Sequence, residues 1–155
     1  MTVEQKLEKL GYHLPPAPAK GGVYASVKSL GNNFYYISGC GAYIDGTEKG
    51  GKLGTDLTIE EGQEAAKRVM LNYLSVIKEH IGSLDKVKSF VKVLVFVSSA
   101  PDFYEQPTVA NGATQLLVDL YGQEIGAPSR SAVGMVSLPG NTPVEIEGIV
   151  EMEAL

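Results

Sequence analysis

The sequence is poor in the residues from which disulfides, metal sites and thiol catalysts are usually built. Its 155 residues include one cysteine, two histidines and no tryptophan. A single cysteine cannot form an internal disulfide, which fits a reducing cytoplasm. His13, His80 and Cys40 stand at unrelated spacings and make no ligand set. We therefore expect neither a metal nor a cofactor.

Long apolar runs and basic clusters are also missing. The longest apolar run, Val93 to Val97, is far too short to cross a membrane. The first six residues lack the basic-then-apolar pattern of a signal segment. The formal net charge is −5 and no Lys/Arg cluster occurs, which disfavours nucleic acid and anionic lipid as partners. These absences indicate a cytoplasmic protein that binds no membrane and no nucleic acid.

Two motifs come close to known chemistry but lack an essential part. Cys40, between Gly39 and Gly41, has no evident base to lower its pKa, so we expect an unreactive thiol; a Cys–His site is the alternative. Gly46 to Lys52 reads G-x-x-x-x-G-K, but Leu53 stands where a phosphate-binding loop needs Ser or Thr. The glycine-rich segment from Gly39 to Gly54 is therefore interpreted as a mobile surface loop.

What the sequence does contain is a pattern of strands and helices that suits one domain. A chain of 155 residues that is 44% hydrophobic can bury a sizeable core. The expected elements are helices over Val3 to Leu10, Thr58 to Ile81 and Val109 to Tyr121, and strands over Val23 to Lys28, Phe34 to Ser38, Val87 to Ser98, Ser131 to Leu138 and Val144 to Met152. This order predicts an α/β (α+β) fold over residues 1–155, with one mixed sheet and two long helices on one face. Residues 1–21 supply an N-terminal helix and a proline-rich connector.

The helix and strand signals are strongest in the middle of the chain. Thr58 and Glu61 form a capping box, and Gly82 suits a C-terminal cap. The strand that follows is apolar on both faces, with Phe90, Leu94 and Phe96 expected on one and four valines on the other. A strand with one wet face would alternate, so both faces should be covered, one by helices and the other by a second subunit.

The two C-terminal strands read as a hairpin, joined by Leu138-Pro139-Gly140-Asn141. In such a hairpin Arg130, at the mouth of the first strand, would lie near Glu145 on the second. The guanidinium could then hold a carboxylate ligand through two parallel hydrogen bonds. The alternative is a surface cross-strand ion pair, which is worth little.

Arg130-Ser131-Ala132-Val133, Leu138-Pro139 and Val144 to Ile149 together resemble the signature of the RidA (YjgF) reactive intermediate deaminase family. Leu30-Gly31-Asn32, Ile37-Ser38-Gly39 and Asp102-Phe103 with Asn111 follow the same family in order. The resemblance runs from about Gly22 to Glu151 and is closest to a longer subgroup whose own activity is less certain.

The resemblance implies a chorismate mutase-like fold, a homotrimer with a barrel-like arrangement of sheets, and ligand sites between subunits. It implies hydrolysis of enamine/imine intermediates to 2-keto acids and ammonia. Arg130 would hold the substrate carboxylate and Glu145 would position water, with Tyr24 packing on the substrate. Ser38, Gly39, Asn111 and the main chain of Ala132 would complete the wall.

Three departures from the family bear on the substrate. Ala132 replaces a cysteine that many members carry, so any thiol role is lost. Cys40 follows Gly39 where the main deaminases usually have glutamine, and the Gly39–Gly54 loop is longer than usual. A non-catalytic binder of small carboxylates such as keto acids remains open. The endoribonuclease label of some relatives is disfavoured by the acidic balance.

Overall fold

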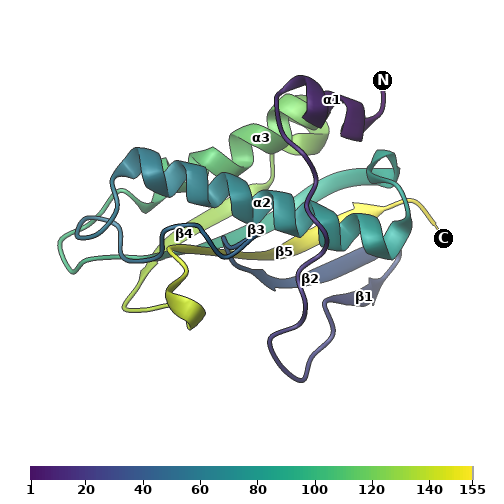
Figure 1. Cartoon of the computed structure of the whole chain (residues 1–155). Helices are drawn as coiled ribbons and strands as arrows, with labels where there is room; N and C mark the ends of the chain where they lie inside the picture. Colours follow the sequence, from purple (N-terminus) through teal and green to yellow (C-terminus); the bar gives the residue numbers. More distant parts are fainter. Residues whose placement is uncertain (155) are drawn as a thin grey trace.

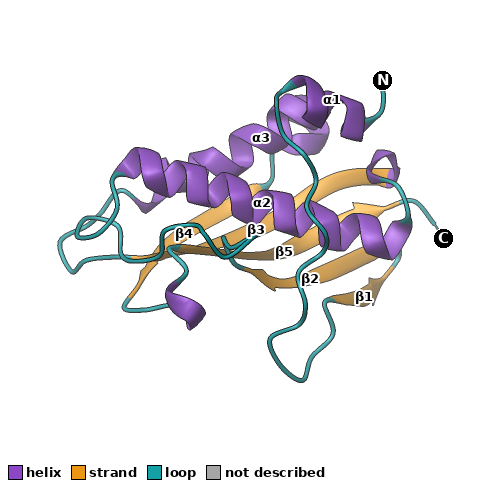
Figure 2. Cartoon of the chain, in the orientation of Figure 1, coloured by secondary structure: helices purple, strands orange, loops and turns teal. Residues whose placement is uncertain are grey.

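One five-stranded mixed sheet carries two long helices on one of its faces, in the computed structural model that describes residues 1–154 (Figures 1 and 2). Helices α2 and α3 run side by side over the sheet, and the short α1 lies beside α3 (Figure 1). The elements are α1 (Val3–Lys9), β1 (Val27–Gly31), β2 (Phe34–Cys40), α2 (Ile59–Ile81), β3 (Val87–Ser98), α3 (Gln106–Gly126), β4 (Ser129–Met135) and β5 (Val144–Met152), with 3₁₀ turns η1 (Leu84–Lys86) and η2 (Pro139–Asn141). The expected fold class is confirmed.

The expected C-terminal hairpin is wrong. The strand order is β1-β2-β5-β3-β4, so β3 lies between β4 and β5. Strand β4 pairs with β3 in parallel, because α3 carries the chain back across the sheet between them. The segment around η2 then crosses the end of β3 and delivers β5 to the middle of the sheet, antiparallel to both neighbours.

Helix α2 begins and ends where its sequence predicts. The Thr58 hydroxyl accepts a hydrogen bond from the Glu61 amide at 3.2 Å, and the Glu61 carboxylate accepts one from the Thr58 amide at 2.8 Å. Gly82 closes the helix in the left-handed conformation, with φ of 83°. Helix α3 starts three residues before the predicted Val109, and Gly122 interrupts it with a non-helical backbone.

The first strand lies further along the chain than predicted. It covers Val27–Gly31 rather than Val23 to Lys28, and its turn to β2 consists of Asn32 and Asn33. Both asparagines have positive φ, 51° and 65°, which matches the right-handed twist of a tight two-residue hairpin. Because β1 begins only at Val27, the segment before it is outside this hairpin and lies beside the end of β2.

The long inner strand β3 divides its side chains between a covered and an open face. Val93, Val95 and Val97 are fully buried under the helices, whereas Leu94 and Phe96 are only partly buried on the opposite face. Phe90, expected beside Leu94, instead packs under α3 against Tyr121, because the pairing with β5 shifts between Phe90 and Lys92. Within residues 1–154, no helix combines the length and hydropathy required to cross a membrane.

Candidate functional site

Four of the predicted site residues lie together on the open face of the sheet. Tyr24, Ser38, Gly39 and Glu145 line a cavity of about 390 Å³, which we call the Glu145 pocket. Its other lining residues are Gly21, Tyr36, Pro139 and Glu147. Glu145 points to the open face because its neighbours on β5, Val144 and Ile146, are fully buried under the helices.

The residues of this pocket are held by short local contacts. The Ser38 hydroxyl donates to the carbonyl of Ala25 at 2.6 Å, which ties the segment before β1 to β2. The Tyr24 hydroxyl accepts from the amide of Gly21 at 3.1 Å. A Cβ atom on Gly39 would lie 2.6 Å from Oε1 of Glu145, so the carboxylate occupies the space that any side chain at this position would need.

The carboxyl group of Glu145 is poised to accept a proton. Partial burial raises its pKa, and the nearby carboxylate of Glu147 raises it further. Glu147 itself accepts a hydrogen bond from the Tyr36 hydroxyl at 3.0 Å. Two acidic groups on one face of β5 therefore make this pocket negatively charged, and no basic side chain among residues 1–154 lines it.

Arg130 and Asn111, the other predicted side-chain ligands, meet at a second place. They line a cavity of about 310 Å³ between the start of β4 and α3, which we call the Arg130 pocket. Nη1 of Arg130 donates to Oδ1 of Asn111 at 2.7 Å and to the Thr114 hydroxyl at 3.2 Å. Its Nε and Nη2 have no hydrogen-bond partner among residues 1–154, which leaves one edge of the guanidinium free for a ligand.

The expected proximity of Arg130 and Glu145 within one subunit is therefore wrong. Arg130 is paired with Val93 and Glu145 with Phe96, two positions on β3 that are three residues apart. Arg130 also turns toward α3, on the covered side of the sheet, while Glu145 faces the open side. Ala132 lies next to Arg130 on the edge strand and packs against the core.

Cys40 has the environment of a structural thiol. It is buried at the end of β2, and its Sγ contacts the carbonyl of Ser38 at 3.6 Å. Burial, together with the nearby carboxylate of Glu145, raises its pKa to about 12. The thiolate that nucleophilic attack requires is then almost absent at neutral pH, which supports the expectation of an unreactive Cys40.

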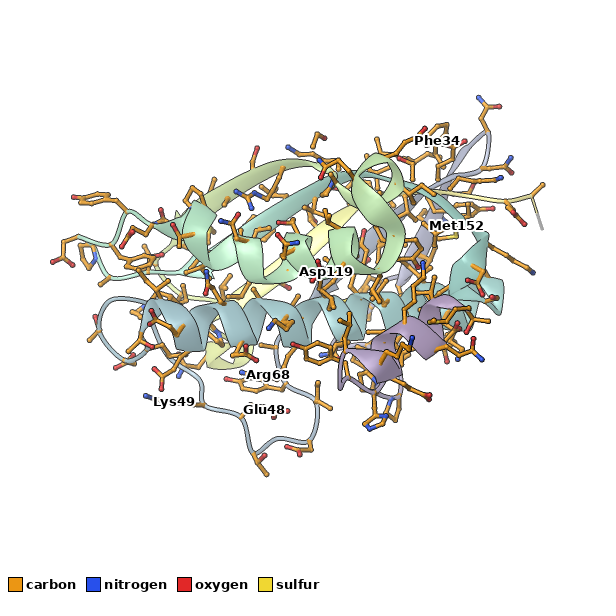
Figure 3. All side chains as sticks on the ribbon, turned by 90° about the horizontal axis from the view of Figure 1, so that it is seen from above. Phe34, Glu48, Lys49, Arg68, Asp119 and Met152 are labelled. Carbon is orange, nitrogen blue, oxygen red and sulfur yellow. The ribbon has the colours of Figure 1, made fainter. Side chains whose placement is uncertain are left out.

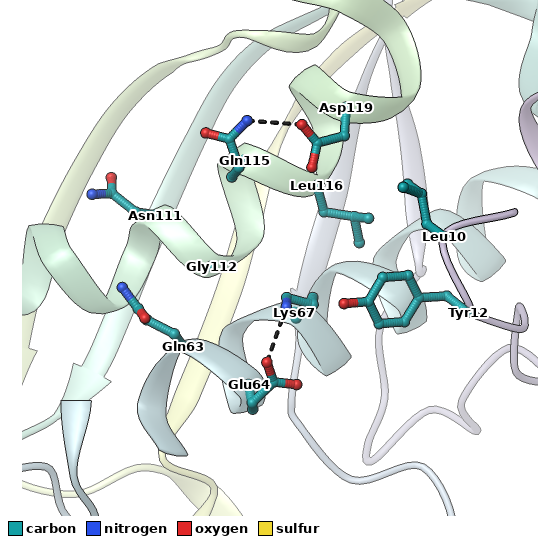
Figure 4. Close-up of a pocket in the computed structure, with 10 residues that line it drawn as sticks. All are labelled: Leu10, Tyr12, Gln63, Glu64, Lys67, Asn111, Gly112, Gln115, Leu116 and Asp119. Atoms are coloured by element: carbon teal, nitrogen blue, oxygen red, sulfur yellow. Dashed lines mark hydrogen bonds and ion pairs between the residues drawn. The ribbon is translucent and has the colours of Figure 1, made fainter. Parts of the chain in front are cut away.

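A third cavity, of about 380 Å³, lies between α2 and α3 on the outer surface, next to Tyr12 (Figure 4). Lys67 pairs with Glu64 at 3.0 Å and lies over the ring of Tyr12, and Gln115 donates to Asp119 at 2.8 Å. Figure 3 shows Asp119 on the helix layer, seen from above. Because its charged groups satisfy one another, this groove is a solvated surface between the helices.

Comparison with known proteins agrees with this fold. A family profile described as "YjgF/chorismate mutase-like, putative endoribonuclease" matches residues 4–147. The chain thus has the chorismate mutase-like fold, and it belongs to the YjgF/RidA family.

Individual relatives indicate a divergent branch of that family. Protein TCP17 of Trypanosoma cruzi is 39% identical over 150 residues, covering 97% of this chain and 94% of its own. The crystal structure of Atu1372 from Agrobacterium tumefaciens, whose function is unknown, is 35% identical with a TM-score of 0.89, covering 99% of this chain and 93% of its own. A protein named 2-iminobutanoate/2-iminopropanoate deaminase from Dermatophagoides farinae is 28% identical over 139 residues, covering 90% and 93%.

Sequence reasoning missed several residues of both pockets. Tyr36 and Glu147 belong to the Glu145 pocket, and Thr114 holds Arg130 beside Asn111. Glu147 could have been found, because it stands two residues after Glu145 and so shares its face of β5. Thr114 follows Asn111 by one helical turn, so it too had a signal in the sequence once Asn111 was chosen.

Proposed function

We propose that this protein hydrolyses small 2-imino acids to 2-keto acids and ammonia, in sites formed between subunits of a homotrimer. The observation that carries this proposal is that the two functional groups lie in two different pockets. One holds a guanidinium with a free edge, and the other holds a carboxyl group whose pKa is raised. Neither pocket alone offers both groups that the reaction needs.

The chemistry divides naturally between these groups. The free edge of Arg130 binds the substrate carboxylate through two parallel hydrogen bonds, which orients the imine carbon. Glu145 accepts a proton from water as the oxygen attacks the carbon of the protonated imine, and the C=N electron pair moves to nitrogen, which gives a neutral carbinolamine. Glu145 then returns that proton to the amine nitrogen. As the C–N bond breaks and ammonia leaves, the hydroxyl proton passes to Glu145 and on to solvent, and the C=O bond of the 2-keto acid forms. The raised pKa of Glu145 makes its carboxylate a better proton acceptor than an ordinary glutamate, which suits a group that must both take and give a proton.

The open face of the sheet favours assembly. Leu94, Phe96 and Ile149 are only partly buried there, and Val133 on β4 is 39% exposed. The outer edge of β4 is also unpaired among the strands of residues 1–154. Apolar residues on a sheet face and an open edge strand are features that association between subunits covers. A head-to-tail ring would bring the β4 side of one subunit against the Glu145 pocket of the next.

Mixing two inactive variants tests this arrangement directly. Arg130→Ala and Glu145→Gln each remove one half of the site, so each homotrimer should release no keto acid from imines generated in situ. Trimers re-formed from an equal mixture contain some interfaces with both halves intact. Random assembly in a ring gives such an interface with a probability of about one in four, so activity should return to about a quarter of wild type.

Glu151→Gln is a matched control for Glu145→Gln, because it removes the same charge from the same strand and face outside the pocket. It should keep full activity. Mixtures that stay inactive, or sedimentation of a stable monomer at micromolar concentration, would reject a shared site. Wild-type protein that binds 2-ketobutyrate in calorimetry without releasing product would be a carboxylate binder rather than an enzyme.

A further inference from the structure

A cavity of about 410 Å³ lies where β3 and β4 end, and it shares no lining residue with the three cavities described above. Its walls are mainly apolar and include Phe103, Tyr104, Met135 and Val136. Met135 stands five residues beyond Arg130 on β4, about 16 Å along the strand. In Figure 1 this is the end of the sheet at which α2 and α3 begin.

The ammonium group of Lys52 is buried at this cavity without a partner. Its Nζ is shielded from solvent and has no hydrogen-bond acceptor among residues 1–154. The backbone around it is fixed, since Leu53 bonds to both Ser98 and Ala100 at 2.8 and 2.9 Å. A shielded ammonium without a counter-charge is costly, and an anion in the cavity would offset that cost.

The start of helix α3 lies at the same cavity. Helices α1 and α2 both start with a threonine capping box, whereas at α3 the N-cap residue Glu105 makes no side-chain capping hydrogen bond and Pro107 has no amide N–H to donate. Gln106, the first residue of α3, lines the cavity. Backbone amides at an uncapped helix start attract anions, and this attraction adds to that of the Lys52 ammonium.

We propose that this cavity is a second ligand site, which takes a monocarboxylate with an apolar body. The single ammonium supplies one charge, and the cavity has no arginine among residues 1–154 to share a doubly charged phosphate. The apolar walls instead suit an aromatic or branched carbon skeleton. The site accounts for Lys52 and the glycine-rich loop that carries it, neither of which takes part in the imine chemistry.

Methionine methyl signals provide a direct test with 3-phenylpropionate as the probe. The chain has four methionines, and of these only Met135 lines the cavity, while Met70 and Met152 are buried in the core. Titration of protein labelled with ¹³C at its methionine methyl groups should shift Met135 and leave Met70 and Met152 in place. Lys52→Gln should weaken this binding at least about tenfold, as should replacing the probe with neutral 3-phenylpropanamide on wild-type protein.

Two matched variants show whether the response of Met135 comes from this cavity. Lys49 lies on the same loop, but its side chain is exposed and pairs with Glu61 (Figure 3). Lys49→Gln should therefore leave the Met135 titration unchanged. Arg130→Ala should leave it unchanged as well, although it removes the proposed imine site. The proposal is overturned if Met135 does not respond, if the amide binds as well as the acid, or if Arg130→Ala and not Lys52→Gln abolishes the shift. Unmoved Met70 and Met152 signals in Lys52→Gln confirm that the variant is folded.

Discussion

The Arg130 and Glu145 pockets are built in opposite ways. Arg130 stands on the edge strand β4, and two side chains of α3 hold one of its nitrogens while its other edge stays free. Glu145 stands on the central strand β5, and its position is set by the absence of a side chain at Gly39. One pocket therefore fixes a cation by hydrogen bonds, and the other fixes a carboxylate by shape.

This difference shows which functional group each pocket lacks. Among residues 1–154, the Arg130 pocket offers a place for a carboxylate but contains no acidic group to move a proton, whereas the Glu145 pocket contains two acidic groups and no cation. A small imino acid needs both, so either pocket alone would bind it poorly. Bringing opposite faces together requires a second subunit, so in the function proposed above catalysis would depend on assembly.

The largest effect should come from removing the cation. Arg130→Ala should abolish binding of 2-ketobutyrate and imine hydrolysis, because losing a charge-assisted bidentate contact costs roughly 2–5 kcal/mol, or at least about thirtyfold in affinity. Arg130→Lys should rescue poorly, since an ammonium cannot reproduce the planar fork. Calorimetric titration measures the affinity directly.

Lys88→Ala is the control for this substitution, because Lys88 is exposed on the neighbouring strand β3 and pairs with Glu153. It should leave binding unchanged. If Arg130 were merely a surface group, its replacement would change stability by less than about 1 kcal/mol and leave the affinity as in wild type. Such a result would remove Arg130 from the site.

A smaller loss should follow from filling the space beside Glu145. Gly39→Ala places a methyl group 2.6 Å from the present position of Oε1, so the carboxylate must move. Misplacing a general base by about 1 Å can cost up to about a hundredfold in rate. Turnover should therefore fall while binding to Arg130 persists, which kinetics and calorimetry together resolve. Gly41→Ala, where the nearest atom is 3.4 Å away, is the control and should retain most of the activity.

The fold was largely predictable because its strongest signals are local. The Thr58–Glu61 capping box and Gly82 fixed the ends of α2, and the bounds of β3 were predicted correctly. Strand pairing was harder, since it depends on contacts between distant segments. The helix between β3 and β4 did favour a parallel crossover, but the motif at Leu138 to Asn141 suggested a hairpin instead.

Some neighbours among the candidate site residues were predictable, but the geometry that relates them was not. Tyr24, Ser38 and Gly39 do gather around Glu145, and Asn111 does hold Arg130. Which face of the sheet each group occupies follows from strand order, and strand order could not be read from spacing. The unpaired ammonium of Lys52 could not be foreseen either, because burial of one atom depends on the whole surrounding fold.

The smallest expected effect is on the free energy of unfolding, and it tests whether the Glu145 and Arg130 pockets interact. The folded-state pKa of Glu145 lies above its unfolded value, so the ionised carboxylate destabilises the folded state above that pKa. Glu145→Gln should therefore raise the free energy of unfolding near pH 7, by less than about 1 kcal/mol since the group is partly exposed. The gain should disappear as the pH falls below about 4.3, where the unfolded-state carboxyl is protonated as well.

Arg130 should change the size of that gain only if the pockets meet. Across an interface, the guanidinium would offset the cost of the Glu145 charge, so Glu145→Gln should stabilise the Arg130→Ala protein more than the wild type. Within one subunit the two groups lie on opposite faces, and their effects should add. Chemical denaturation at pH 7 of the wild type, Arg130→Ala, Glu145→Gln and the double variant gives the coupling free energy between the two residues. Glu151→Gln serves as the correction for the general effect of making the net charge of −5 less negative. Strict additivity would mean that the two pockets work separately, and the shared site would then have to be abandoned.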